Sequence, residues 1–168
     1  MSEKGSPHFV VPDSIEPVLG WKGWTLTGMC RLRSPSFVTA WIPGSPLKAD
    51  CGQAVPCQET PGERCRCGIY IAGSAYKAAG YGYILGKVYG WGKTVVHETG
   101  WRVEHAYPSE LFVPAALMDS GEVFRELGEY GVPVIPLDDY DFRILTTPTA
   151  TEAEWVLERM KRWRVRKT

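Results

Sequence analysis

Four of the five cysteines fall within seventeen positions, and this cluster constrains the fold more than any other feature of the sequence. The spacing is Cys51-x5-Cys57-x7-Cys65-x-Cys67. The cluster lies in residues 43–68, a segment rich in proline and glycine with little hydrophobic periodicity. A structureless loop of this length is unusual in a compact domain unless something orders it. We therefore expect the cysteines to order the loop.

A structural zinc ion accounts best for this cluster. Zinc takes four thiolate or imidazole ligands at tetrahedral angles, and a structural site uses all four positions. Cys65 and Cys67 can form a tight knuckle, because the glycine at position 68 lets the backbone turn sharply. Cys51 and Cys57 can reach the same ion from the preceding arm. Metal binding and ordering of the loop would then be one event.

The spacing differs from the usual CxxC pair, so the cluster is also compatible with three states that lack zinc. They are an iron–sulfur cluster, a redox pair and unliganded thiols. If one cysteine of the cluster is not a ligand, His97 or His105 is the expected substitute. The fifth cysteine, Cys30, lies in a strand-like stretch and is expected to be a small buried apolar residue.

Size and charge predict a single soluble domain in the cytoplasm. The chain has 168 residues, which is the usual size of one domain. Lysine plus arginine and aspartate plus glutamate both number 19, so the chain has no global attraction for nucleic acid or membranes. Neither a signal peptide nor a membrane span is recognisable. A reducing compartment also favours metal binding over disulfides.

The patterning predicts an α+β fold with a small antiparallel sheet or partly open barrel, a zinc-braced loop and flanking C-terminal helices. Residues 1–12 are expected to form a loose leader. Even spacing of apolar residues predicts strands within 21–33 and 36–42. Residues 83–107 are expected to form a three-stranded meander, with strands at 83–89, 93–97 and 101–107 and turns at Trp91-Gly92 and Thr99-Gly100.

Three helices are expected. The first is short and covers residues 74–79. The second starts at a capping pair, Asp119 and Glu122, and buries a face made of Val123, Phe124, Leu127 and Tyr130 before stopping at Gly131. The third covers residues 151–168. It begins at a capping box of Thr151 and Glu154, carries a stripe of Val156, Met160 and Trp163, and ends in a basic tail.

The segments CRCGIYIA and VYGWGKTVVHETGWRVEHAYPSEL resemble a group of small, largely uncharacterised zinc-binding (CxCG-type) proteins of actinobacteria and their phages. The resemblance covers residues 17–111. It implies metal ligands at Cys51, Cys57, Cys65 and Cys67, with Cys57 standing where the group more often has histidine. It implies no activity.

A polar cluster on two predicted strands is the best candidate for chemistry. It consists of His97, Glu98, Arg102, Glu104 and His105. An imidazole and a carboxylate in contact can act as acid and base or hold a second metal. Arg102 can equally form a cross-strand ion pair with either glutamate, which makes the group a structural ladder. Nearby, the glycines and Lys93 of GKVYGWGKT resemble a phosphate-binding loop, but a strand follows where that motif requires a helix.

Two functions are therefore expected. The first is a non-enzymatic, zinc-stabilised binding module for a protein or nucleic-acid partner, since a closed four-cysteine site leaves no position for substrate. The basic tail offers candidate nucleic-acid contacts, namely Arg159, Arg162, Trp163 and Arg166. The alternative is a small-molecule enzyme or ligand-sequestering protein that uses the polar cluster.

Overall fold

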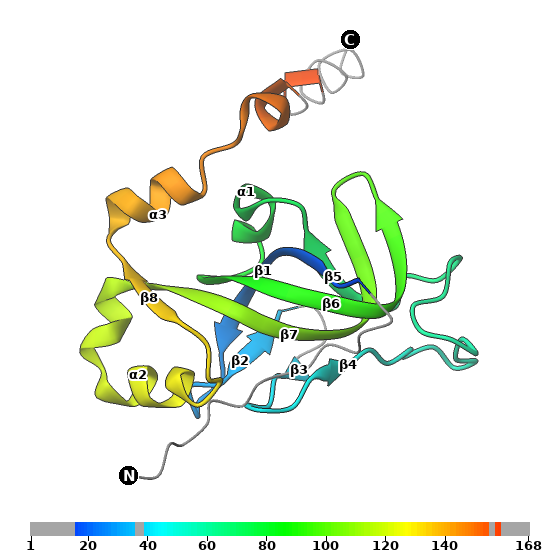
Figure 1. Ribbon diagram of the computed structural model, residues 1–168, viewed down its shortest axis with the longest axis horizontal. Coiled ribbons are helices and arrows are strands. Elements are labelled where there is room, and N and C mark those ends of the chain that lie inside the picture. The colour runs from blue at the N-terminus through cyan, green and yellow to red at the C-terminus, as the bar shows by residue number, and fades with distance from the viewer. Residues whose placement is uncertain (1–15, 36–38, 155–156, 159–168) are drawn as a thin grey trace.

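A computed structural model describes residues 16–35, 39–154 and 157–158 of this chain. It has the α+β fold that the sequence predicts, built on an eight-stranded, mostly antiparallel sheet (Figure 1). The strands are β1 (Val18–Leu26), β2 (Leu32–Ser34), β3 (Thr39–Ala40), β4 (Leu47–Lys48), β5 (Ile69–Ala72), β6 (Ile84–His97), β7 (Gly100–Pro114) and β8 (Val134–Leu137). The helices are α1 (Ala75–Ala79), the 3-10 helix η1 (Ala115–Asp119), α2 (Gly121–Gly128) and α3 (Asp139–Leu145).

Four strands form a ring of hydrogen bonds. β1 pairs with β6, β6 with β7, β7 with β5, and β5 returns to β1. The last contact is a single residue pair, Trp21 and Ala72, so the ring is not a true barrel. The short strands β4 and β8 both pair with β7, and β8 is the parallel member. The predicted antiparallel sheet or partly open barrel corresponds to this ring.

The hydrophobic core fills the ring and extends under α2. Trp24 and Trp41 are both fully buried, and their rings meet edge to face at 5.4 Å. Burying aromatic rings of this size contributes much of the apolar area in a small domain. Val123 and Leu127 of α2 join the same cluster. Among the described residues, five aromatic side chains are buried in the core, namely Trp24, Trp41, Trp91, Tyr107 and Tyr130.

A buried pair of tyrosines connects the segment after α2 to the start of the cysteine loop. The Tyr130 hydroxyl donates to the carbonyl of Trp41 at 2.6 Å and accepts from the amide of Leu32 at 3.0 Å. The Tyr107 hydroxyl donates to the carbonyl of Tyr130 at 2.9 Å and accepts from the amide of Gly44 at 2.7 Å. Burial raises the pKa of Tyr130 to about 12, so this hydroxyl keeps its proton. These bonds satisfy main-chain groups that water does not reach.

The predicted three-stranded meander is wrong in one respect. β6 runs unbroken through Trp91-Gly92, and the predicted turn there is a β-bulge. Trp91 faces His105 and Thr94 faces Val103, so β6 carries one extra residue at this point. Gly92 has φ +78°, a conformation that suits glycine at a bulge. The turn predicted at Thr99-Gly100 is confirmed, since His97 faces Gly100 across a two-residue connection.

The N-terminal half differs from the prediction at Cys30. This residue lies in the turn between β1 and β2, with φ +57°, and not in a strand. It is half-buried and packs against the core. Burial raises the pKa of its thiol. Of the predicted strand at 36–42, only β3 is seen, and residues 36–38 lie outside the described part of the chain.

The short predicted helix is present as α1, capped by Ser74, but α2 starts later than predicted. The residue that flanks the start of α2 is Ser120 rather than Asp119, because residues 115–119 form η1. No side chain makes a capping hydrogen bond at this end of α2. Phe124, predicted to be buried, is 58% exposed. Tyr130 is buried as predicted, and Gly131, the predicted stop, has a positive φ of 69°. The helix α3 was not predicted, although the side chain of Asp138 caps it by accepting from the amide of Asp141 at 2.7 Å.

The C-terminal helix begins two residues earlier than predicted. Its capping box is formed by Thr149 and Glu152, whose carboxylate accepts from the Thr149 amide at 2.8 Å. The Ser74 hydroxyl at the start of α1 also donates to Glu152, which is buried. The additional hydrogen bond from Ser74 explains why Glu152, and not Glu154, is the capping residue. Residues 155–156 and 159–168, with the predicted stripe and basic tail, lie outside the described residues, as does the leader at 1–12.

Candidate metal centre

The cysteine loop leaves the sheet after β4 and returns to it at β5. β5 pairs with the part of β7 that carries Arg102. Gly68 ends the knuckle with φ +118°. A Cβ at this position would lie 2.8 Å from the side chain of Pro61 and 3.1 Å from that of Arg102. Only glycine permits this combination of backbone angle and close approach. The sharp turn predicted from the sequence is therefore confirmed.

The four cysteine sulfur atoms converge on one point. The Sγ of Cys51 lies 3.7 Å from that of Cys57 and 3.9 Å from that of Cys65, and the Sγ of Cys67 lies 3.9 Å from that of Cys57. All four atoms lie within 4.8 Å of one another. Four thiolates at about 2.3 Å around a tetrahedral ion are about 3.8 Å apart, so the arrangement fits one metal ion.

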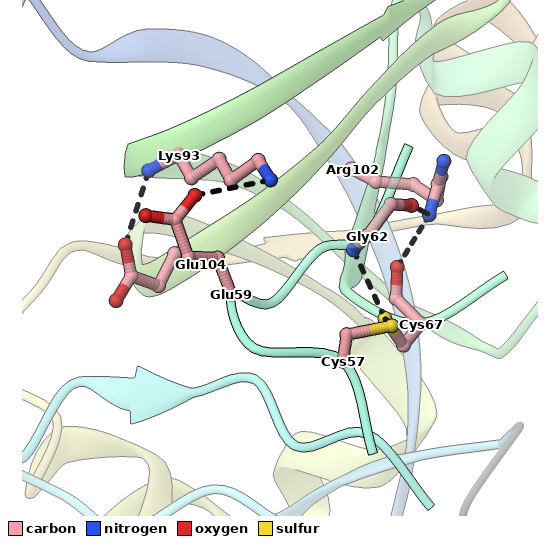
Figure 2. A network of polar contacts seen from close by, with 7 residues as sticks. All are labelled: Cys57, Glu59, Gly62, Cys67, Lys93, Arg102 and Glu104. Carbon is pink, nitrogen blue, oxygen red and sulfur yellow. Dashed lines mark hydrogen bonds and ion pairs between the residues drawn. The ribbon is translucent and has the colours of Figure 1, made fainter. Parts of the chain in front are cut away.

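The surroundings of the sulfur atoms shift the pKa values of two of the four thiols in opposite directions. The main-chain amides of Cys57 and Gln53 donate to Cys51 and lower the pKa of its thiol to about 7. The hydrogen bond with Cys51 and burial together raise the pKa of Cys57 to about 12. The amide of Gly62 donates to the Sγ of Cys67 at 3.2 Å (Figure 2). Such amide donors stabilise negative sulfur, which is the form that binds metal.

Arg102 connects the loop to the sheet, a role that the sequence analysis did not assign to it. Its Nη1 donates to the carbonyl of Cys65 at 2.6 Å. It also donates to the carbonyls of Cys67 at 2.6 Å and Gly62 at 3.2 Å (Figure 2). Among the described residues, the expected cross-strand ion pair with Glu98 or Glu104 is not formed. The strand pairing places Arg102 opposite Tyr70, shortly after the knuckle. A correct prediction of this pairing would have indicated that Arg102 lies near the cysteine loop.

A second connection runs through the bulge in β6. The Nζ of Lys93 lies 3.3 Å from a carboxylate oxygen of Glu59 in the loop, and the amide of Lys93 donates to Glu104 at 3.1 Å (Figure 2). Glu104 thus satisfies an amide that the bulge removes from the strand ladder. Lys93 and Thr94 lie within a strand, as expected, and β6 continues past them where a phosphate-binding loop requires a helix.

The predicted polar cluster divides into separate contacts. The Nε of Arg102 donates to the Nε2 of His97 at 2.7 Å. The Nε2 of His105 lies 3.3 Å from Glu104, and the ring of His105 stacks on Trp91 at 5.7 Å. Neither histidine belongs to the group of sulfur ligands. Glu98 is exposed, and within the described residues it makes no hydrogen bond or ion pair with the other four.

A half-exposed aromatic face lies on β1, β6 and β7, and we call it the aromatic face. In the strand pairing, Leu19 lies opposite Tyr89, and Lys87 lies between Trp21 and Glu110 as the partner of both. The sixth member, Phe112, lies two residues beyond Glu110 on β7. The rings of Trp21 and Phe112 stack at 5.5 Å, and the Nζ of Lys87 lies 5.6 Å from the Trp21 ring centroid. Lys87 also forms an ion pair with Glu110 at 3.1 Å. The sequence analysis did not identify this surface, because it depends on strand register.

Comparison with models of protein families, with curated proteins and with solved structures finds no match to this chain. The resemblance to the actinobacterial and phage group therefore stays a prediction. Within the described residues, no helix has the length and apolar character needed to cross a membrane.

Proposed function

We propose that this chain is a zinc-stabilised, non-enzymatic binding module for a protein or nucleic-acid partner in the cytoplasm. The observation that carries the proposal is the mutual approach of four sulfur atoms, all of which lie within 4.8 Å of one another. A tetrahedral ion held by four protein ligands has no open position for a substrate or an activated water. Its contribution is to hold the loop at residues 43–68 in one conformation.

Zinc fits this donor set better than an iron–sulfur cluster or a redox pair. An iron–sulfur cluster distributes its cysteines over more than one iron, which disfavours a single group in which all four sulfur atoms lie within 4.8 Å of one another. A disulfide brings two sulfur atoms to about 2.05 Å. Thiolate sets with tetrahedral spacing select zinc among the common divalent metals of the cytoplasm.

The aromatic face supports a role in binding. Two stacked rings beside a lysine and a glutamate form a surface that is apolar at its centre and polar around it. Aromatic residues are enriched in interaction surfaces, since they contribute large contact areas at low cost in side-chain entropy. The alternative enzyme has less support, because Arg102 and His97 are engaged with the cysteine loop and with each other.

Native mass spectrometry of protein purified from cells without added metal tests the metal component. We expect one zinc ion per chain and, after chelation, increased hydrogen exchange across residues 43–68 with little change at β6 and β1. Less than about half an equivalent of zinc in intact protein would contradict the proposal, because closed thiolate sites bind zinc tightly. For the binding role, substitution of Trp21 by alanine should weaken partner binding without loss of zinc.

A further inference from the structure

Arg102 is a buried cation without an acidic partner among the described residues. Its side chain belongs to β7, and the residue is 3% exposed. Its hydrogen-bond acceptors are three main-chain carbonyls and the imidazole of His97, and none of them is a carboxylate. In the part of the chain that the structure describes, no carboxylate lies within ion-pair distance of its guanidinium. A buried charge in such surroundings is costly unless something compensates it.

The four-cysteine site supplies the missing negative charge. Four thiolates around a divalent ion carry a net charge of about −2. The guanidinium donates directly to the carbonyls of two of the ligand residues, Cys65 and Cys67. Within hydrogen-bond distance, the guanidinium meets only the dipoles of carbonyl groups and of the His97 imidazole. With metal, the buried cation and the anionic centre stabilise each other.

We propose that Arg102 is the counter-ion and a positioning residue of the metal centre. The proposal rests on the proposed metal site and adds a prediction about its charge. Arg102 favours a centre of net charge −2 over one of net charge −1, and therefore a divalent over a trivalent ion. Arg102 also orients the knuckle, because its Nη1 donates to the main-chain carbonyls of Gly62, Cys65 and Cys67.

His97 orients the guanidinium of Arg102. Its Nε2 accepts a hydrogen bond from the Nε of Arg102 at 2.7 Å, which fixes the plane of the guanidinium. The charged groups at the neighbouring bulge have partners of their own. Lys93 binds Glu59 through its ammonium group and Glu104 through its amide, and Glu104 also contacts His105. The guanidinium of Arg102 therefore depends on the metal centre for compensation.

The reduction potential of the iron-substituted protein tests the charge role, since ferrous and ferric iron give the site net charges of −2 and −1. The variants are Arg102→Gln, which removes the charge, Arg102→Lys, which keeps it, and Arg66→Gln as a control on the exposed side of the knuckle. We expect Arg102→Gln to lower the potential, so that the ferrous-to-ferric ratio at a fixed potential falls about tenfold or more. A tenfold change corresponds to about 59 mV for a one-electron couple. Arg102→Lys should keep the ratio within about threefold of the original protein because it keeps the charge, and Arg66→Gln should do so because exposed charges are screened.

Zinc affinity measured by chelator competition provides the second readout. We expect Arg102→Gln to bind zinc about 10- to 100-fold more weakly, as for other residues that support metal ligands. If Arg102→Gln does not fold, Arg102→Lys decides the matter: a lysine variant that folds, binds zinc and keeps the iron potential supports the charge role. An unchanged potential in Arg102→Gln, or a lysine variant that loses the metal, would overturn the proposal. Failure of the original protein to bind any metal would instead overturn the proposed function.

Discussion

The guanidinium Nη1 of Arg102 lies 2.6 Å from the carbonyl oxygen of Cys67, and this hydrogen bond joins the beginning of β7 to the knuckle that carries two of the four clustered cysteines. The sheet and the cysteine loop therefore share a buried contact. If a metal ion orders the loop, as we propose, this contact transmits the stabilisation to the sheet, and loss of the metal would expose a cation that the fold has buried.

Cys65→Ser is expected to destabilise the protein strongly and to abolish zinc binding, because a hydroxyl is a poor substitute for a structural thiolate. Cys30→Ser is the matched control, since Cys30 is half-buried and lies outside the sulfur cluster. It should cost about 1 kcal/mol or less. Thermal unfolding and zinc analysis of both variants make the comparison. A more damaging effect at Cys30 would show that the ligands are wrongly assigned.

Gly68→Ala is expected to destabilise the protein by about 1–3 kcal/mol or more, because position 68 has φ +118° and no room for a Cβ beside Pro61. Gly52→Ala, in the same loop, is the control, since a Cβ there meets nothing within 4 Å. Urea unfolding of the zinc-bound variants measures both. Equal stabilities would contradict the proposed geometry of the knuckle.

Tyr130→Phe is expected to cost about 1–3 kcal/mol, because it leaves the buried Trp41 carbonyl and Leu32 amide without the hydroxyl that binds both. Tyr140→Phe is the control, since Tyr140 is 71% exposed. Denaturant titration should separate the two variants clearly. Retention of full stability in Tyr130→Phe would mean that water replaces the hydroxyl.

The lowered pKa of Glu152 predicts that the contact between the C-terminal helix and Ser74 is sensitive to acid. Burial raises the pKa of Glu152, but the hydrogen bonds from Ser74 and Thr149 outweigh it, and the net pKa is lowered. A carboxyl whose folded pKa is lowered stabilises the fold above its unfolded pKa, and this stabilisation is lost as the pH falls through the folded value. Hydrogen exchange at residues 150–154 should therefore increase in acid. Glu152→Gln should remove that dependence, whereas Glu154→Gln, an exposed neighbour, should retain it.

The basic tail decides between the two classes of partner. If Arg159, Arg162, Trp163 and Arg166 contact nucleic acid, affinity must fall steeply with salt, because each neutralised phosphate releases a counterion. Deletion of residues 164–168 should then weaken binding without lowering the melting temperature. Since the chain has no net charge, we expect gel shifts with DNA and RNA at moderate salt to show no complex. A salt-sensitive complex that the deletion abolishes would place nucleic acid first among the partners.

The local sequence was sufficient for several features that neighbouring residues decide, although α3 and its local cap at Asp138 were missed. The cysteine cluster and Gly68 indicated the metal centre, because its ligands and the turn they need lie within one short loop. The short helix α1 and the turn at Thr99-Gly100 were likewise readable from adjacent residues. These features depend on backbone conformation and ligand chemistry, both of which short-range order determines.

Contacts between distant residues decided the rest. Strand register assembled the aromatic face, and a bulge satisfied by Glu104 kept β6 continuous where a turn was predicted. Glu152 caps the last helix because Ser74, far away in the sequence, donates to the same carboxylate. Arg102 binds the carbonyls of the cysteine loop in place of either neighbouring glutamate. A buried polar group bonds to whichever partner the fold brings near, and no local pattern in the chain specifies that partner.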